Sequence, residues 1–258
     1  MKKRVFPLFL FLLSLSVSAL PHNPSTPYGW YCPRCREGES VPAKDASFSF
    51  MDGKKAIWFD ENADENDKVI YLTFDAGYEN GNVAKILDVL HKHAAPGTFF
   101  ILSHLAEKET PLVQRMLDEG HLVCNHTSSH CDMSRKTDRE SFLGELKELD
   151  DAMEKAVGVP AAKFYRPPEG RFSENNLVWA EEAGYTTVFW SFAYADWDND
   201  RQPDPGEAKE KILSHAMNGS VFLLHPTSAT NAAVLDEVMT VLEREGFRFG
   251  RIDEIETD

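Results

Sequence analysis

Six side chains that can exchange protons or bind a metal ion lie shortly after predicted strands. They are Asp75, His126, His130, Arg166, Asp196 and His225. A carboxylate can act as a general base, histidines can hold a metal ion or donate a proton, and an arginine can keep a carboxylate ionised. A structural role explains any one of them, but it explains their joint placement poorly. We therefore expect these side chains to form one active site.

The pair His126 and His130 is the best candidate for a metal site. Two imidazoles four residues apart meet on one side of a helical turn, where both nitrogens can reach one ion. A hydrogen-bonded structural role is at least as common for such a pair, so the spacing alone leaves both interpretations open.

The elements that must position these residues follow an alternating pattern from Val69 onward. Apolar runs predict seven strands, at 69–74, 97–102, 121–124, 163–165, 186–190, 220–224 and 247–251. Helical spacing predicts six helices, at 83–93, 112–119, 139–157, 177–183, 207–217 and 232–245. This alternation indicates an α/β fold with a parallel sheet or barrel, in which active sites form at the carboxyl ends of the strands.

The first 19 residues have the features of a secretory signal peptide. Lys2, Lys3 and Arg4 precede an apolar run over 5–13, and Val17-Ser18-Ala19 offers a small-residue cleavage site. The run is too short to span a bilayer comfortably, and a retained anchor helix is the alternative. We expect an exported protein without a stable membrane anchor after cleavage.

The charge balance excludes several partners. There are 27 Lys and Arg residues against 42 Asp and Glu residues among 258, which gives a net charge of −15. Phosphate binding requires a basic face, so the composition argues against nucleic acid and against anionic membrane surfaces. We expect a monomer.

Residues 20–67 are expected to form an N-terminal arm that wraps a domain at 68–258. The arm has little periodicity and contains five prolines, and it offers Trp30, Phe48, Phe50 and Trp58 as anchors. One domain is the economical interpretation of the remaining chain.

Four cysteines leave several uses open. Cys32-Pro33-Arg34-Cys35 fits a disulfide, a redox pair or half a zinc site. A second such pair is absent from the sequence, so a disulfide outside the cell, or no function, is preferred. Cys124 and Cys131 are either bridged or free.

Five motifs resemble, in order, those of the NodB-type polysaccharide deacetylases (carbohydrate esterase family 4). They are Thr73-Phe74-Asp75-Ala76-Gly77, His126-Thr127-Ser128-Ser129-His130, Arg166-Pro167-Pro168-Glu169-Gly170, Asp196-Trp197 and Leu223-Leu224-His225. Segments 77–81, 172–174 and 189–194 resemble one branch, the delta-lactam-biosynthetic de-N-acetylases, which act on muramic acid in spore-cortex peptidoglycan. The resemblance covers about 69–252 and implies a distorted (β/α) barrel that hydrolyses an N-acetyl amide on a glycan.

The resemblance also implies a role for the charged residues. Asp75 would be the general base that deprotonates water, Arg166 would keep it ionised, and His225 would be the general acid for the departing amine. A divalent ion on His126 and His130, with Zn, Mn, Mg and Co as candidates, would polarise the acetyl carbonyl.

The remaining candidates would shape the site or contact the substrate. The backbone N–H of Glu169, after two prolines, would complete an oxyanion hole. Asp196 and Trp197 would form the wall around the general acid, and Tyr78 is a further candidate for substrate binding. Arg171 would recognise the lactyl carboxylate of muramic acid, and a plain surface arginine is the alternative.

Two positions depart from the family pattern. Ala76 replaces the aspartate that serves relatives as a third metal ligand, which predicts weak, exchangeable metal or metal-free hydrolysis. Ala193 stands where many relatives have an aspartate that tunes the catalytic histidine. His225 therefore either has a lower pKa here or uses Asp196 instead.

Three functions remain open at this point. The first is hydrolytic removal of the N-acetyl group from muramic acid in peptidoglycan, as a step toward muramic delta-lactam during sporulation. The second is deacetylation of another glycan, such as N-acetylglucosamine, chitin-like or xylan chains. The third is a catalytically dead glycan-binding relative, suggested by Ala76 and opposed by the retention of Asp75 and His225. The expected partner is a glycan strand in the cell wall or spore cortex.

Overall fold

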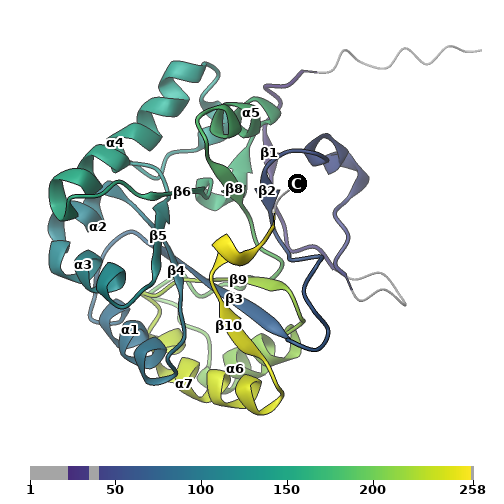
Figure 1. Ribbon diagram of the computed structural model, residues 1–258, viewed down its shortest axis with the longest axis vertical. Helices are drawn as coiled ribbons and strands as arrows, with labels where there is room; N and C mark the ends of the chain where they lie inside the picture. The colour runs from purple at the N-terminus through teal and green to yellow at the C-terminus, as the bar shows by residue number, and fades with distance from the viewer. Residues whose placement is uncertain (1–22, 35–40, 257–258) are drawn as a thin grey trace, which may run out of the picture.

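The computed structural model describes residues 23–34 and 41–256. The predicted signal peptide and Cys35 lie outside these residues. The described chain is built around a curled parallel sheet with helices on its outer side (Figure 1). Its strands, in spatial order, are β10 (Arg248–Gly250), β3 (Val69–Ala76), β4 (Thr98–Ile101), β5 (Leu122–Asn125), β6 (Ala162–Tyr165), β8 (Thr186–Val188) and β2 (Ala56–Ile57).

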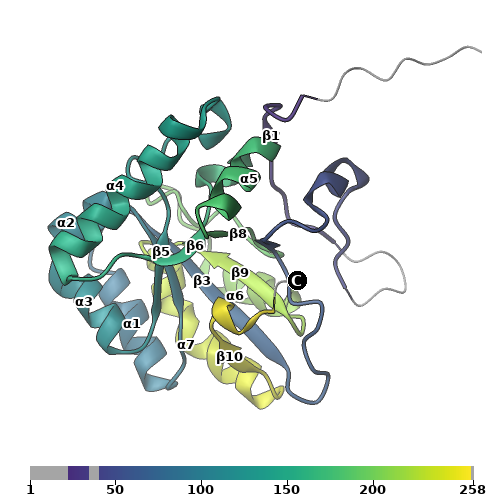
Figure 2. The ribbon, with the colours of Figure 1, turned by 45° about the horizontal axis from the view of Figure 1, so that its top comes forward.

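The strand β3 pairs with three other strands, two of which, β10 and β4, are its neighbours in this order. It also pairs with β9 (Ser220–Leu224), over Ile70 to Phe74. Beyond β8, Phe192 forms a further parallel bridge to Phe222 of β9, so the curled sheet nearly returns to its starting point. All seven expected strands are present, and the expected distorted (β/α) barrel is confirmed (Figure 2).

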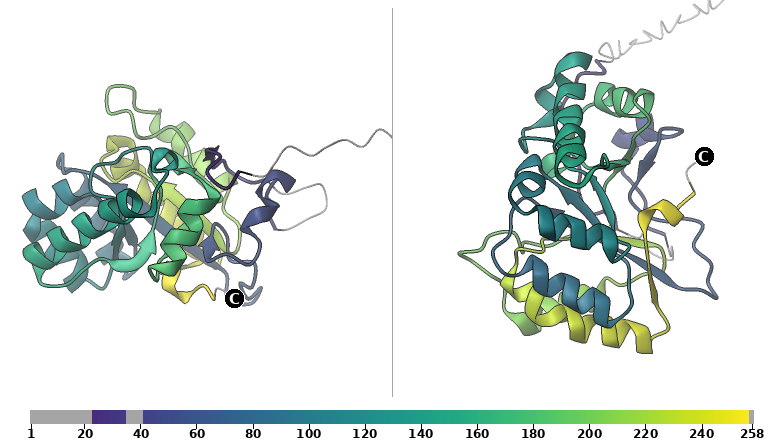
Figure 3. Two further views of the ribbon diagram at one scale, coloured as in Figure 1. Left: turned by 90° about the horizontal axis from the view of Figure 1, so that it is seen from above. Right: turned by 60° about the vertical axis from the view of Figure 1, so that its left-hand side comes forward.

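The helices cover the outside of the sheet, as the two views in Figure 3 show. They are α1 (Val83–Lys92), α2 (Ser103–Lys108), α3 (Thr110–Asp118), α4 (Arg139–Val157), α5 (Glu174–Glu182), α6 (Pro205–Ser214) and α7 (Ala229–Arg244). The six expected helices are all found, and α2 is an addition of fewer than two turns. In the described part of the chain, no helix combines the length and the apolar character that crossing a membrane requires.

Local signals explain where these helices begin and end. Asp138 caps α4 by accepting a hydrogen bond from the Ser141 amide, and Gly158 ends the same helix in the left-handed conformation with φ 79°. Ser173 and Asn176 form a reciprocal capping box at the start of α5. Short 3₁₀ turns complete the chain, at η1 (Ala46–Met51), η2 (Met133–Arg135), η3 (Pro168–Gly170) and η4 (Ile252–Glu254).

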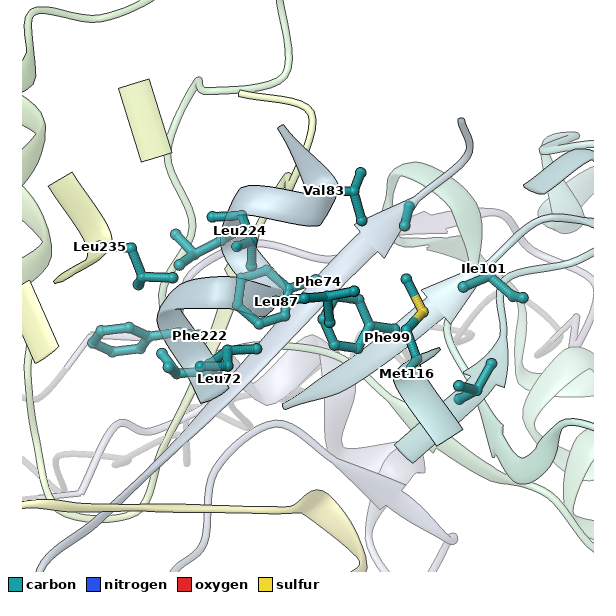
Figure 4. Close-up of a cluster of buried hydrophobic side chains, with 14 of the residues drawn as sticks. Leu72, Phe74, Val83, Leu87, Phe99, Ile101, Met116, Phe222, Leu224 and Leu235 are labelled. Carbon is teal, nitrogen blue, oxygen red and sulfur yellow. The ribbon is translucent and has the colours of Figure 1, made fainter. Parts of the chain in front are cut away.

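Side chains alternate along β3, so that one face of the strand packs in the core and the other carries residues of the site described below. Ile70, Leu72 and Phe74 pack against the helices, and Phe74 stacks on Phe99 with ring centroids 4.9 Å apart (Figure 4). Tyr71 belongs to a second buried cluster, with Phe100 and Val221. Because side chains alternate between the two faces of a strand, Thr73 and Asp75 share the face of Tyr71.

The N-terminal arm contributes structure that the sequence pattern did not predict. It supplies β2 and the strand β1 (Tyr28–Gly29), which pairs antiparallel with β7 (Arg171–Phe172). Of the four expected anchors, Trp30 and Phe48 are buried in an aromatic cluster, and Phe50 and Trp58 pack partly buried against it. The described part of the arm therefore lies beside β8 and α5 (Figure 1).

A histidine at the carboxyl end of α1 links that helix to α7. His93 has carboxylate oxygens on both ring nitrogens, 2.8 Å from Asp236 and 2.9 Å from Glu243. Burial alone would lower the pKa of His93, but the hydrogen bonds and charges of Asp236 and Glu243 raise it above its ordinary value.

We predict that this histidine stabilises the fold only when it is protonated. The folded state binds the proton more tightly, so the stabilisation is complete below pH about 6.5 and is lost as pH rises through the higher folded pKa. Urea unfolding of wild type and His93→Gln across pH 5 to 9 should show a difference that shrinks toward alkaline pH. Asp236→Asn should weaken this trend, and a pH-independent difference would contradict the prediction.

Candidate active site

The guanidinium of Arg166 lies inside the barrel and is completely buried, with 0% exposure. Nη1 donates to Asp75 Oδ1 at 2.8 Å, and Nη2 donates to Thr73 Oγ1 at 2.8 Å. Nε and Nη2 also donate to the carbonyl oxygens of Val188 and Phe189 at the end of β8. A buried cation requires such partners. These charge-assisted hydrogen bonds hold Arg166 in place and also orient Asp75 and Thr73.

Asp75 is held in its ionised form. Burial alone would raise the pKa of this carboxyl, but the interactions with His126, Arg166 and His225, including the hydrogen bond from Arg166, lower it below its ordinary value. Arg166 is the permanent cation among these neighbours. Asp75 therefore carries a negative charge at neutral pH, as a general base requires.

His126 is neutral and has one ring nitrogen facing the site. Nδ1 lies 2.9 Å from the carbonyl oxygen of Arg166, which can only accept, so Nδ1 carries the proton. Nε2 lies 3.5 Å from Asp75 Oδ2. Burial is the main reason why the pKa of His126 is lowered to about 4.

The two histidines meet as expected, but the predicted helical turn between them is wrong. Thr127 and His130 both adopt the left-handed conformation, with φ 75° and 57°, and the His130 amide donates to Thr127 Oγ1. This irregular turn brings the two ring centroids to 5.1 Å. Left-handed non-glycine residues are strained and occur often at functional sites.

The donor chemistry of the two histidines fits a divalent metal ion. His126 is neutral, and its other nitrogen is oriented by a backbone carbonyl, which is the usual outer contact of a metal-binding histidine. Within residues 23–34 and 41–256, however, no group of three or more potential ligands is assembled. Ala76 is fully buried among apolar side chains and offers no ligand.

His225 forms a dyad with Asp196. Nδ1 lies 2.7 Å from Asp196 Oδ1, and the His225 amide donates to Asp196 Oδ2 at 2.8 Å. Burial alone would lower the pKa of His225, but the hydrogen bond and charge of Asp196 and the charge of Asp75 raise it. Of the two alternatives opened by Ala193, the lower pKa is therefore wrong, and Asp196 supports the histidine.

Asn231 supports the site and was not predicted from the sequence. Asn231, in the first turn of α7, is 1% exposed, and its Nδ2 donates to Asp196 Oδ2 and to the His225 carbonyl oxygen. Its Oδ1 accepts a hydrogen bond from Tyr194 Oη. Asn231 thus fixes the orientation of Asp196. The sequence signal was weak, because an asparagine near a helix start usually indicates only a cap.

The loop after β6 places Glu169 at the cavity described below. Glu169 has φ 55°, a left-handed conformation, and it follows Pro167 and Pro168 as expected. No hydrogen bond between described residues engages the Glu169 amide. Its carboxylate accepts a hydrogen bond from Arg171 Nε at 2.9 Å.

These groups face a cavity of about 590 Å³. The residues that line it are Asp75, His130, Glu169, Trp190, Ala193, Tyr194, Ala195, Trp197, Leu223 and His225. A smaller adjoining cavity of about 260 Å³ adds His126 and Tyr78. Trp197 and Tyr78 are 61% and 44% exposed, so two aromatic faces are available to a sugar ring at the rim.

Neither Arg171 nor a described cysteine lines the two cavities. Arg171 is exposed and paired with Glu169, and it is not among the residues that line either cavity. Cys32, Cys124 and Cys131 are free thiols, so the predicted alternative of a Cys124–Cys131 bridge is wrong.

Comparison with known proteins identifies the family. Residues 62–188 match the sequence model of the family described as polysaccharide deacetylase. The chain is 36% identical over 232 residues to the peptidoglycan-N-acetylmuramic acid deacetylase PdaA of Bacillus subtilis, covering 90% of this chain and 87% of that protein. It is 33% identical over 188 residues to a peptidoglycan-N-acetylglucosamine deacetylase of Bacillus cereus, covering 71% and 66%. The chain belongs to the polysaccharide deacetylase family.

A solved structure agrees with this assignment. The structure of Bacillus subtilis PdaA, described as a family 4 carbohydrate esterase, superposes with a TM-score of 0.82 at 35% identity. The match covers 90% of this chain and 98% of that chain. The motifs of the sequence therefore belong to a carbohydrate esterase fold.

We predict that Asp196→Asn lowers the pKa of His225, because it removes the charge that favours the protonated ring. The alkaline limb of kcat/KM for acetate release should move to lower pH by about one unit or more. Asp198→Asn is the matched control, since Asp198 lies on the same loop and its Oδ1 accepts only from the Asp200 amide. An unchanged alkaline limb in Asp196→Asn would contradict the assignment.

Proposed function

We propose that this chain hydrolyses the N-acetyl group of muramic acid residues in peptidoglycan. One observation carries the proposal: Asp75 and His225 face the same cavity with pKa values shifted in opposite directions. A carboxylate kept ionised and a histidine whose protonated form is favoured are suited to be the base and the acid that amide hydrolysis requires. A glycan-binding protein without activity needs neither.

The reaction begins with water beside Asp75. The carboxylate accepts a proton from this water as the oxygen attacks the acetyl carbonyl, and Arg166 holds the carboxylate in position. The Glu169 amide donates to the developing oxyanion. His225 then protonates the amine as the carbon–nitrogen bond breaks, and acetate and a free amino sugar leave the site.

His126 and His130 would hold a divalent ion, which supplies a Lewis acid for the acetyl carbonyl when it is bound. Two protein ligands are fewer than the three of most catalytic zinc sites, so the ion exchanges readily. We propose that Ala76, where relatives carry a third ligand, is the reason for this weak binding.

The choice of muramic acid is supported by the similarity to PdaA and by Arg171. A muramic residue without its peptide carries a lactyl carboxylate, which a guanidinium recognises well. Arg171 lies two residues after Glu169 and already binds the carboxylate of that residue. We propose that the lactyl carboxylate replaces Glu169 on Arg171.

The second candidate is deacetylation of N-acetylglucosamine residues. Neither cavity is lined by lysine or arginine among the described residues, and Glu169 places a carboxylate at the rim. A neutral sugar needs no cation, so this feature favours glucosamine over muramic acid.

The cellular setting is a further proposal. The segment 1–19 as a signal peptide, the arm at 20–67 and the catalytic domain at 68–258 suit an exported monomer that acts in the cell wall or spore cortex. The freed amine and the lactyl carboxyl of one muramic residue can close a six-membered lactam. This product is the delta-lactam of spore cortex.

We predict acetate release from peptidoglycan strands whose muramic acid has lost its peptide. The same assay on intact peptidoglycan and chitin oligomers, with the products weighed by mass spectrometry, gives the specificity. Release only from chitin oligomers or intact peptidoglycan would replace muramic acid by glucosamine as the substrate. Glycan binding without any release would make the chain an inactive relative.

We predict that Arg171→Ala raises KM on the stripped muramic strand about 10-fold or more and leaves chitin oligomers unaffected, since only muramic acid presents the carboxylate. Arg139→Ala, which breaks an exposed pair with Glu182, is the control for loss of a surface charge. Equal effects of Arg171→Ala on both substrates would remove this role.

We predict weak metal binding, with a dissociation constant for zinc above about 1 μM by calorimetry. EDTA should lower acetate release, added zinc should restore it, and His130→Ala should abolish the response. His104→Ala, at an exposed position on α2, should leave it intact. Tight stoichiometric zinc in the wild-type chain would contradict the two-ligand site.

A further inference from the structure

Trp30 of the N-terminal arm contacts the loop after β6, which carries Glu169. This residue is 7% exposed and donates two hydrogen bonds, one from its backbone and one from its side chain, to segments that border the cavity. Its backbone N–H donates to the Gly170 carbonyl oxygen at 2.8 Å, directly after Glu169. Its indole Nε1–H donates to the Trp190 carbonyl oxygen, also at 2.8 Å. Trp30 therefore links the loop after β6 to Trp190, which lines the cavity in the segment after β8.

The packing around this contact leaves no room for a side chain at position 170. A Cβ atom added to Gly170 would lie 2.9 Å from the Cβ of Trp30 and 2.9 Å from the ring of Trp190, and Gly170 itself has φ 65°. The indole of Trp30 stacks on Phe189 with ring centroids 4.5 Å apart. The pairing of Gly29 with Arg171 continues the contact as a short antiparallel sheet. Figure 2 shows β1 near α5, the helix that follows β7 in the chain.

One side of this contact lies before the part of the chain that the family model matches. That match spans residues 62–188, so it includes Gly170 but not Trp30. The Gly170 amide donates to Pro167 within the motif, and the arm adds a hydrogen bond from outside it, to the Gly170 carbonyl oxygen.

We propose that Trp30 is a positioning residue for deacetylation, which holds the Glu169 amide and the Trp190 wall in place from the arm. The inference rests on the proposed function, because the amide matters only if an oxyanion forms there. An oxyanion donor is effective only within about 2.7–3.1 Å of the charge, so a small shift of the loop lowers kcat. Substrate binding at the exposed aromatic rim depends on Trp197 and Tyr78 and is affected less.

The test compares the same substitution, tryptophan to phenylalanine, at Trp30 and at Trp58 of the arm. Trp30→Phe keeps an aromatic ring against Phe189 and removes the hydrogen bond to the Trp190 carbonyl. Trp58→Phe is the matched control, because Trp58 packs against the same cluster, its indole nitrogen has no partner among the described residues, and it lines neither active-site cavity. Both variants are made in the full chain, and their melting temperatures are compared.

We expect kcat for acetate release to fall about 10-fold in Trp30→Phe, less than the 10²–10³-fold loss when a whole oxyanion donor is removed, with KM changed less than about threefold. Trp58→Phe should keep both constants within about twofold. A second readout needs no turnover: hydrogen exchange of the peptide covering 166–173, followed by mass spectrometry, should become faster in Trp30→Phe only.

The outcomes separate this inference from the proposed function. Equal loss of kcat in both variants, or unchanged exchange at 166–173 in Trp30→Phe, would overturn the positioning role while the wild-type activity stands. A wild-type chain that releases no acetate would refute the proposed function and the catalytic part of this inference. The exchange comparison would then still decide whether Trp30 holds the loop.

Discussion

The buried guanidinium of Arg166 is the interaction on which the rest of the site depends. A cation in the barrel interior is stable only if each of its donors has a partner, and these partners come from β3 and the end of β8. Its backbone also binds the neighbouring strand loop, where its carbonyl accepts from His126. One residue thus sets the charge of Asp75 and the tautomer of His126. Removing it would leave the carboxylate buried without its permanent counter-charge.

The general base and the general acid of the site have different buried partners. On one side, Arg166 keeps Asp75 ionised, and burial keeps His126 neutral. On the other side, Asp196 favours the protonated form of His225, and Asn231 orients Asp196. Base and acid are therefore set by separate buried partners, so that both can be in the required form at the same pH. The loop that carries Glu169 lines the same cavity, and its Gly170 carbonyl oxygen accepts a hydrogen bond from Trp30 of the arm.

Much of the fold and the site was predictable from the sequence, because apolar runs of three to six residues mark the seven main strands and polar residues follow them. The strands β1, β2 and β7 have two residues each, too few for any periodicity to be seen. The turn between His126 and His130 was predicted as helical, but Thr127 and His130 are left-handed, and spacing alone cannot distinguish the two. Asn231 and Trp30 were not predicted as parts of the site, since their partners are distant in sequence and only the folded chain brings them together.

The most direct test of this account is the pKa of Asp75, measured by carbon-13 NMR of its carboxyl group during a pH titration. The wild-type carboxyl should stay ionised to a pH below about 3.9, the ordinary value for aspartate. In Arg166→Met, shown to be folded by circular dichroism, the pKa should rise by one unit or more, because burial then acts without the counter-charge. A wild-type pKa at or above the ordinary value, or an unchanged pKa in Arg166→Met, would contradict the claim that this buried arginine makes Asp75 a base.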